Sequence, residues 1–142
     1  MSAPLYNQRI LRLAADIPHH ARLPDPMGTS EKRSAVCGSR VTVDADVDGD
    51  GRVSAVGLLV RACALGQASS SLLARYVVGR SPEELADTRD RLAAWLAGAG
   101  EAPDWPGVDV LEPALPHSAR HASIRLAFEA AAEAAARAAA AR

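Results

Sequence analysis

One stretch of the chain alternates between apolar and polar residues, and it constrains the fold more than any other feature. Its apolar positions are Val41, Val43, Ala45 and Val47, with polar residues between them. Successive side chains of a strand point to opposite faces, so this pattern is typical of a strand with one buried face. The run Asp48-Gly49-Asp50-Gly51 predicts a hairpin turn, because these residues tolerate positive φ. Residues 52–60 then form the partner strand, and a shorter strand before Cys37 would complete a three-stranded antiparallel sheet.

Helical patterns flank these strands. Ser81 and Glu84 form a capping box around Pro82, which predicts the start of a helix. Segments rich in proline, 16–30 and 98–117, are predicted to be irregular. Strands followed by segregated helices indicate the α+β class, with a three-stranded antiparallel sheet flanked by about four to five helices. The predicted helices cover residues 4–15, 67–78, 82–97 and 119–141.

Length, charge and hydropathy indicate a single domain and argue against a nucleic-acid-binding or membrane protein. The 142 residues fit one domain spanning 1–142, whose Ala-rich end, 131–142, is expected to fray. With 16 basic and 17 acidic residues and no basic stripe, the chain does not look like a nucleic-acid binder. No apolar run is long enough to span a membrane, and the N-terminus lacks the pattern of a secretory signal. We therefore expect a cytoplasmic protein without nucleic-acid or membrane partners.

The two cysteines are too few for a disulfide framework. Cys37 directly precedes the alternating strand, and Cys63 stands where the partner strand gives way to a helix. A helix N-terminus favours a thiolate, and the neighbouring Arg40 and Arg61 act in the same direction. Antiparallel pairing of the two strands would bring both thiols to one end of the hairpin. The residues alone leave a second interpretation open, in which each cysteine is a small apolar filler.

Short motifs spread over nearly the whole chain carry a family resemblance. In chain order they are Leu5-Tyr6-Asn7, Ile17-Pro18-His19-His20, Val36-Cys37-Gly38-Ser39, Cys63 with Gln67-Ala68-Ser69-Ser70-Ser71, Val78-Gly79-Arg80-Ser81, and Arg120-His121-Ala122-Ser123-Ile124. Together they resemble the IscU, SufU and NifU N-terminal family of iron–sulfur cluster assembly scaffolds. The most specific match is Cys63 with 67–71. The resemblance implies the family's three-stranded antiparallel sheet flanked by helices, the architecture that the residue pattern also predicts.

The resemblance implies a metal site as well. Carried over residue by residue, it assigns Cys37, Cys63 and His121 as ligands of an iron–sulfur cluster or a zinc ion. The chain departs from the family at Ser39, where the family has Asp, and at Ala122, where it has a third cysteine. Two thiolates and one imidazole suit zinc and leave a fourth coordination position open.

These implications define the expected function. We expect a divergent scaffold or carrier rather than a turnover enzyme, with Cys37 also a possible sulfur acceptor. Ser39, Arg61 and Arg120 are auxiliary candidates near the thiols. The implied partners are a cysteine desulfurase, which would donate sulfur, and apo-proteins, which would accept a cluster.

Two alternatives remain at this point. Cys37-Gly38-Ser39 also resembles the Cys-x-Ser loop of SufE-like proteins, in which one loop cysteine accepts persulfide sulfur from the desulfurase. Cys63 would then be structural. The other alternative is a binding module of the same fold that regulates the same partners without sulfur chemistry.

Overall fold

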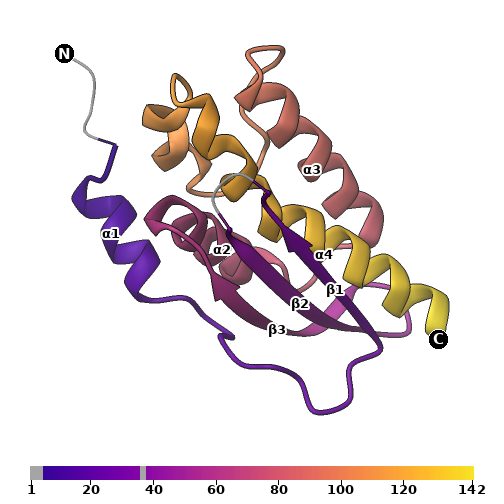
Figure 1. Cartoon of the computed structure of the whole chain (residues 1–142). Coiled ribbons are helices and arrows are strands. Elements are labelled where there is room, and N and C mark those ends of the chain that lie inside the picture. Colours follow the sequence, from indigo (N-terminus) through magenta and orange to yellow (C-terminus); the bar gives the residue numbers. More distant parts are fainter. Residues whose placement is uncertain (1–4, 36–37) are drawn as a thin grey trace.

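The protein has an α+β fold in which helices pack against a three-stranded antiparallel sheet of order β1-β2-β3 (Figure 1). The computed structural model describes residues 5–35 and 38–142. Within these residues, no helix has the length and apolar character needed to cross a bilayer. The elements are α1 (Gln8–Ala15), β1 (Gly28–Arg33), β2 (Arg40–Val47), β3 (Val53–Arg61), α2 (Ala64–Tyr76), α3 (Pro82–Leu96), the 3₁₀ segments η1 (Val108–Ala114) and η2 (Ser118–Arg120), and α4 (His121–Ala141).

The predicted apolar positions of the central strand share one face, but Thr42 and Asp44 of the polar face are buried too, so the strand is covered on both faces rather than on one. Val41 and Val43 of β2 are fully buried on the face covered by α4. The β2–β3 register pairs Val43 with Leu58, so apolar residues meet on that same face. The predicted hairpin is confirmed: the Asp48 amide donates to the Arg52 carbonyl at 2.8 Å, and Gly51 adopts φ 79°.

The opposite face of the sheet is partly covered by the segment that leads into β1. The Leu58 amide donates to the carbonyl of His19 at 2.9 Å, so this segment runs along the edge of β3. It passes so close to Gly57 that a side chain there would collide with the backbone of Ala21 and Leu23. Residues 16–30 are predicted to be irregular, but β1 begins within them, at Gly28.

Helix starts follow the local signals. Asn7 caps α1, its Oδ1 accepting a hydrogen bond from the Ile10 amide at 3.0 Å. Ser81 caps α3 as predicted, with the Glu84 amide donating to its Oγ at 3.1 Å. The Glu84 carboxylate accepts from Arg52 at 2.8 Å, which uses the acidic half of the predicted capping box in a tertiary ion pair.

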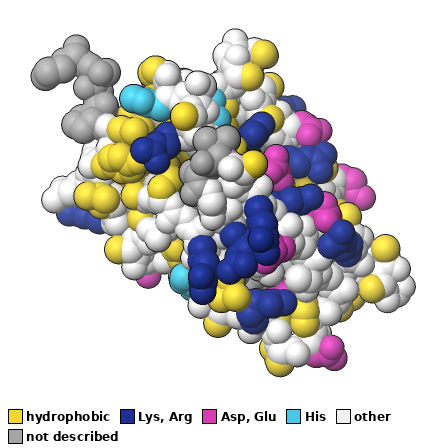
Figure 2. All heavy atoms as spheres, viewed as in Figure 1, with side chains coloured by type: hydrophobic (Ala, Val, Ile, Leu, Met, Phe, Trp, Pro, Cys, Tyr) yellow, Lys and Arg dark blue, Asp and Glu magenta, His cyan; other side chains and the backbone are white. Residues whose placement is uncertain are grey.

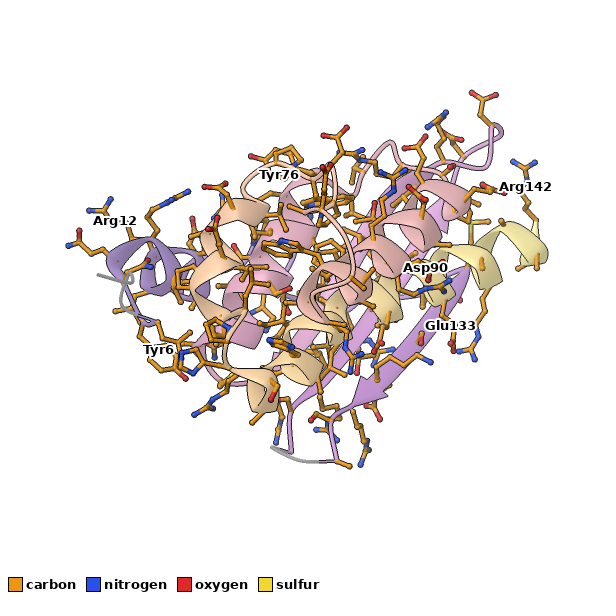
Figure 3. The ribbon with its side chains drawn as sticks, turned by 90° about the horizontal axis from the view of Figure 1, so that it is seen from above. Tyr6, Arg12, Tyr76, Asp90, Glu133 and Arg142 are labelled. Atoms are coloured by element: carbon orange, nitrogen blue, oxygen red, sulfur yellow. The ribbon has the colours of Figure 1, made fainter. Side chains whose placement is uncertain are left out.

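The last helix, α4, extends through Ala141 and buries several alanines of its second half. The fraying that the sequence predicts over 131–142 stays a prediction. Gly28 of β1 explains why the small residues suffice: a Cβ there would strike the backbone at Ala134 and Ala138, so strand and helix meet in close contact. Glu133, labelled in Figure 3, pairs with Lys32 of β1 at 2.7 Å. The buried alanines of this segment are Ala131, Ala132, Ala134, Ala135 and Ala138.

Candidate thiol and metal site

Cys63 lies at the junction that the sequence indicates. It follows the end of β3 and is the N-cap residue of α2, with extended backbone angles of φ −66° and ψ 172°. Its thiol is half-buried, with Sγ 3.5 Å from the hydroxyl of Ser123 in the first turn of α4. Cys37 lies outside the described residues, so the predicted convergence of the two thiols stays a prediction.

The thiol of Cys63 contacts the first of two buried hydroxyl groups, which also contact each other. The Oγ atoms of Ser123 and Ser39 lie 3.1 Å apart, and both side chains are almost inaccessible to solvent. Gly66 makes room for this contact, because a Cβ there would collide with the Ser123 hydroxyl. The predicted auxiliary residue Ser39 thus contacts Ser123, and Ser123 in turn contacts Cys63.

Ser123 is a site residue that sequence reasoning missed. Its only signal is its place in the motif that follows His121, which puts it in the first helical turn of α4. Side-chain hydroxyls near a helix start are common caps, so the residue type alone does not indicate contact with a thiol 60 positions earlier.

The environment of Cys63 favours the thiolate. Burial by itself would raise the pKa of the thiol. The hydrogen bond from Ser123, the backbone amides of Gly66 and Leu65, and the positive charge of Arg120 together outweigh burial and lower the pKa of Cys63. The amide contribution is the helix N-terminus effect that the sequence predicts.

Removing the Ser123 hydroxyl is therefore expected to raise the pKa of Cys63. We predict that Ser123→Ala shifts the midpoint of thiol alkylation to higher pH and slows alkylation at neutral pH, because only the thiolate reacts. The measurement uses iodoacetamide and a Cys37→Ala background, so that Cys63 is the sole thiol. Ser118→Ala, at an exposed serine of η2, is the matched control. An unchanged midpoint in Ser123→Ala would contradict this description of the site.

One ring nitrogen of His121, Nε2, is hydrogen-bonded to the backbone. Nε2 lies 3.0 Å from the carbonyl oxygen of Ala114 and 3.1 Å from that of Leu115. Carbonyl oxygens only accept, so Nε2 carries a proton, and in the neutral ring Nδ1 then keeps the lone pair. Histidine ligands of metals characteristically donate their other ring N–H to a carbonyl or carboxylate, which fixes the orientation of the ring. The surroundings of His121 therefore suit a ligand that binds through Nδ1.

The two auxiliary arginines differ in their relation to the thiol. Arg120, the residue before His121, contributes to the lowered pKa of Cys63. Arg61 is exposed at the end of β3. Within residues 5–35 and 38–142, no three His, Cys, Asp or Glu side chains group closely enough to hold a metal ion. A centre built on Cys63 and His121 thus needs a donor from outside those residues, which is the place predicted for Cys37.

The chain is similar to known proteins in sequence and in fold. A family model described as the NifU-like N terminal domain matches residues 5–138. The crystal structure of a nitrogen-fixing NifU-like protein (N-terminal) from Brucella abortus is 39% identical, covers 94% of each chain and has a TM-score of 0.87. No curated protein gives a significant match.

Two more distant structures share the fold. A putative iron–sulfur cluster assembly scaffold protein for the SUF system from Fervidobacterium islandicum AW-1 is 18% identical, covers 92% of this chain and 96% of its own, and has a TM-score of 0.83. A hypothetical protein of known structure is 21% identical, with coverage of 90% and 94% and a TM-score of 0.75. Because the family match spans almost the whole described chain and the Brucella protein agrees in sequence as well as in fold, this chain belongs to the family of NifU-like N-terminal domains.

Proposed function

We propose that this protein is a divergent scaffold or carrier in iron–sulfur cluster assembly, with Cys37, Cys63 and His121 as the ligands of its cargo. The observation that carries the proposal is the thiol of Cys63, half-buried at a helix N-terminus with a lowered pKa. A structural cysteine buried among apolar side chains would have a raised pKa instead. Membership of the NifU-like family gives this reactive thiol its expected chemistry.

The donor set fits both candidate cargoes. Thiolate sulfur and imidazole nitrogen are the preferred ligands of zinc, and thiolates hold iron–sulfur clusters. Two backbone carbonyls fix Nε2 of His121, so its ring need not reorient to bind through Nδ1. When Cys63 is a thiolate it can only accept, so the Ser123 hydroxyl then donates to it and stabilises the thiolate before any cargo binds. Three protein donors leave one position for an outside sulfur, a small thiol or a partner's side chain.

The proposal also includes the partner proteins and the cellular location. A cysteine desulfurase would supply sulfur, with Cys37 as the residue that first accepts it, and apo-proteins would receive the finished cargo. The protein would act in the cytoplasm as a carrier rather than as a turnover enzyme.

Metal binding by anaerobically prepared protein tests the proposal. Zinc is titrated into the metal-free protein, and the amount bound per chain and its affinity are measured; we expect about one zinc per chain. His121→Ala should weaken binding at least about tenfold, because loss even of an outer partner of a metal ligand costs that much. His20→Ala, at an exposed histidine of the segment before β1, should bind as the unchanged protein does.

Two results would contradict the proposal. One is a protein that holds neither zinc nor a cluster after anaerobic treatment with ferrous iron and sulfide. The other is stimulation of a cysteine desulfurase that requires Cys37 but survives the loss of both Cys63 and His121. The second result would favour the sulfur-acceptor alternative, in which Cys63 is only structural.

A further inference from the structure

Three arginines form a row across the end of the sheet. The strand register places Arg40 of β2 directly opposite Arg33 of β1 on one side and Arg61 of β3 on the other. Directly opposed residues of antiparallel strands project from the same face, with Cβ atoms about 4.5–5.5 Å apart. Like charges in this arrangement repel each other and destabilise the sheet. This arginine row, Arg33, Arg40 and Arg61, therefore opposes folding unless something neutralises it.

The described residues neutralise only part of the row. Glu31 pairs with Arg33 at 3.0 Å and lies 3.7 Å from Arg40. The hydrogen bond from Arg33 is the main reason that the pKa of Glu31 is lowered. No acidic side chain of the described residues forms an ion pair with Arg61. Among the described residues, Glu31 is thus the acidic side chain that pairs with the row, and it pairs with two of the three guanidinium groups.

The arginine row borders two adjoining hollows on the outer face of the sheet. Their volumes are about 550 and 600 Å³, and Arg40 and Arg61 line both of them. Leu59 lines the first hollow with 45% of its surface exposed, which places apolar area beside the cations. Figure 2 shows Lys and Arg side chains gathered near the middle of this view, in the region of the strands. The surface is broad and open, so it suits an extended segment better than an enclosed small ligand.

We propose that the arginine row is a docking surface for an acidic segment of a partner protein. Planar guanidinium groups bind carboxylates in a bidentate manner, and a row of three offers this geometry to successive acidic side chains. Arginine is one of the residue types enriched among the side chains that contribute most to binding at protein interfaces. The chain as a whole has a net charge of −1, so its overall field does not attract a long polyanion. Attraction of an acidic segment to the arginine row would therefore come from local charge complementarity rather than from the net charge of the chain.

The arginine row lies close in sequence to both cysteines of the proposed thiol site. Arg61 lies two residues before Cys63, and the connection from Arg33 to Arg40 contains Cys37. A partner bound here has its own chain held beside the proposed thiol site. The identity of that partner as the sulfur donor or the cargo recipient rests on the proposed function; the binding of an acidic segment does not.

A labelled decaglutamate peptide tests this inference directly. Its binding to metal-free protein is followed by fluorescence anisotropy, at low and at raised salt. We expect Arg61→Glu and Arg40→Glu each to weaken binding at least about tenfold, because close charge pairs at an interface couple this strongly or more. Arg61→Gln should have a smaller effect in the same direction. Arg12→Glu makes the same charge change on exposed α1 (Figure 3) and should leave affinity nearly unchanged.

Several outcomes would overturn the inference. Equal weakening by Arg12→Glu would show that the peptide responds only to net charge. Saturable binding of inorganic phosphate that Arg61→Glu abolishes, without peptide binding, would assign the row to a small anion. Tighter binding of duplex DNA than of decaglutamate would assign it to nucleic acid. Circular dichroism checks that each variant is folded. Because the assay contains no metal, its failure leaves the proposed metal site standing, and failure of zinc binding leaves this surface standing.

Discussion

Replacing Cys63 with alanine is expected to weaken zinc binding at least about 100-fold and to prevent retention of an iron–sulfur cluster. Loss of an outer-shell partner alone can cost up to about 100-fold, and a direct thiolate ligand contributes more. The change should leave the fold intact, because the Cys63 side chain is only half-buried. Metal analysis after anaerobic reconstitution, with the visible absorption of the cluster, measures the effect.

The control for Cys63→Ala is its thermal unfolding, measured with and without zinc. Thermal unfolding of Cys63→Ala without metal should resemble that of the unchanged protein, since a half-buried thiol contributes little packing. Zinc should raise the midpoint of unfolding of the unchanged protein but not that of the variant, because a ligand stabilises only the state that binds it. A zinc-dependent rise of equal size in Cys63→Ala would remove Cys63 from the site.

Replacing Asp44 with alanine is expected to lower the free energy of unfolding by about 2–3 kcal/mol. Asp44 is fully buried on the outer face of β2. Its carboxylate accepts hydrogen bonds from Arg22 at 2.6 Å, from the Leu23 amide at 3.0 Å and from the Thr29 hydroxyl at 2.7 Å. Without it, the segment that crosses the sheet loses its anchor and these donors lose their acceptor. The half-exposed Arg22 can turn to water, which keeps the cost below that of a fully buried pair.

Urea unfolding measures this loss, and Asp50→Ala is the matched control. Asp50 is exposed in the hairpin turn, so its replacement should change the free energy of unfolding by no more than about 0.5 kcal/mol. Equal effects of the two substitutions would contradict the anchoring role of Asp44.

The stabilisation that Asp44 provides should depend on pH. Burial alone would raise the pKa of Asp44, but the hydrogen bonds from Arg22, Thr29 and Leu23 outweigh it and lower the pKa. A lowered pKa means that the stabilisation is present above the unfolded-state value and is lost as pH falls through the folded-state value. The difference in stability between the unchanged protein and Asp44→Ala should therefore shrink in acid.

Local sequence signals predicted much of the fold. The strand from Val41 to Val47 and the following Asp-Gly turn each depend on neighbouring residues, and both elements are found as predicted. The burial of Thr42 and Asp44 on the polar face of that strand was not predicted, because it depends on the distant segment that crosses the sheet. Ser81 caps its helix for the same reason. Signals of this kind are readable because the physical cause lies within a few positions of the residue.

The remainder depends on contacts between distant segments. The burial of α4 alanines requires Gly28, more than a hundred positions earlier, and nothing in the Ala-rich run indicates it. The contact of Ser123 with Cys63 arises only when α4 meets the start of α2. The arginine row likewise follows from strand register, which sequence spacing did not give for β1. The metal role of Cys37, Cys63 and His121 came from the family resemblance, and it stays a prediction.

X-ray absorption at the zinc edge is the most direct measurement of the central claim, that two thiols and one imidazole share one metal. The spectrum is recorded on zinc-loaded protein prepared without air. We predict two sulfur neighbours at about 2.3 Å and at least one imidazole nitrogen at about 2.0–2.1 Å. A first shell made only of nitrogen and oxygen would contradict the account.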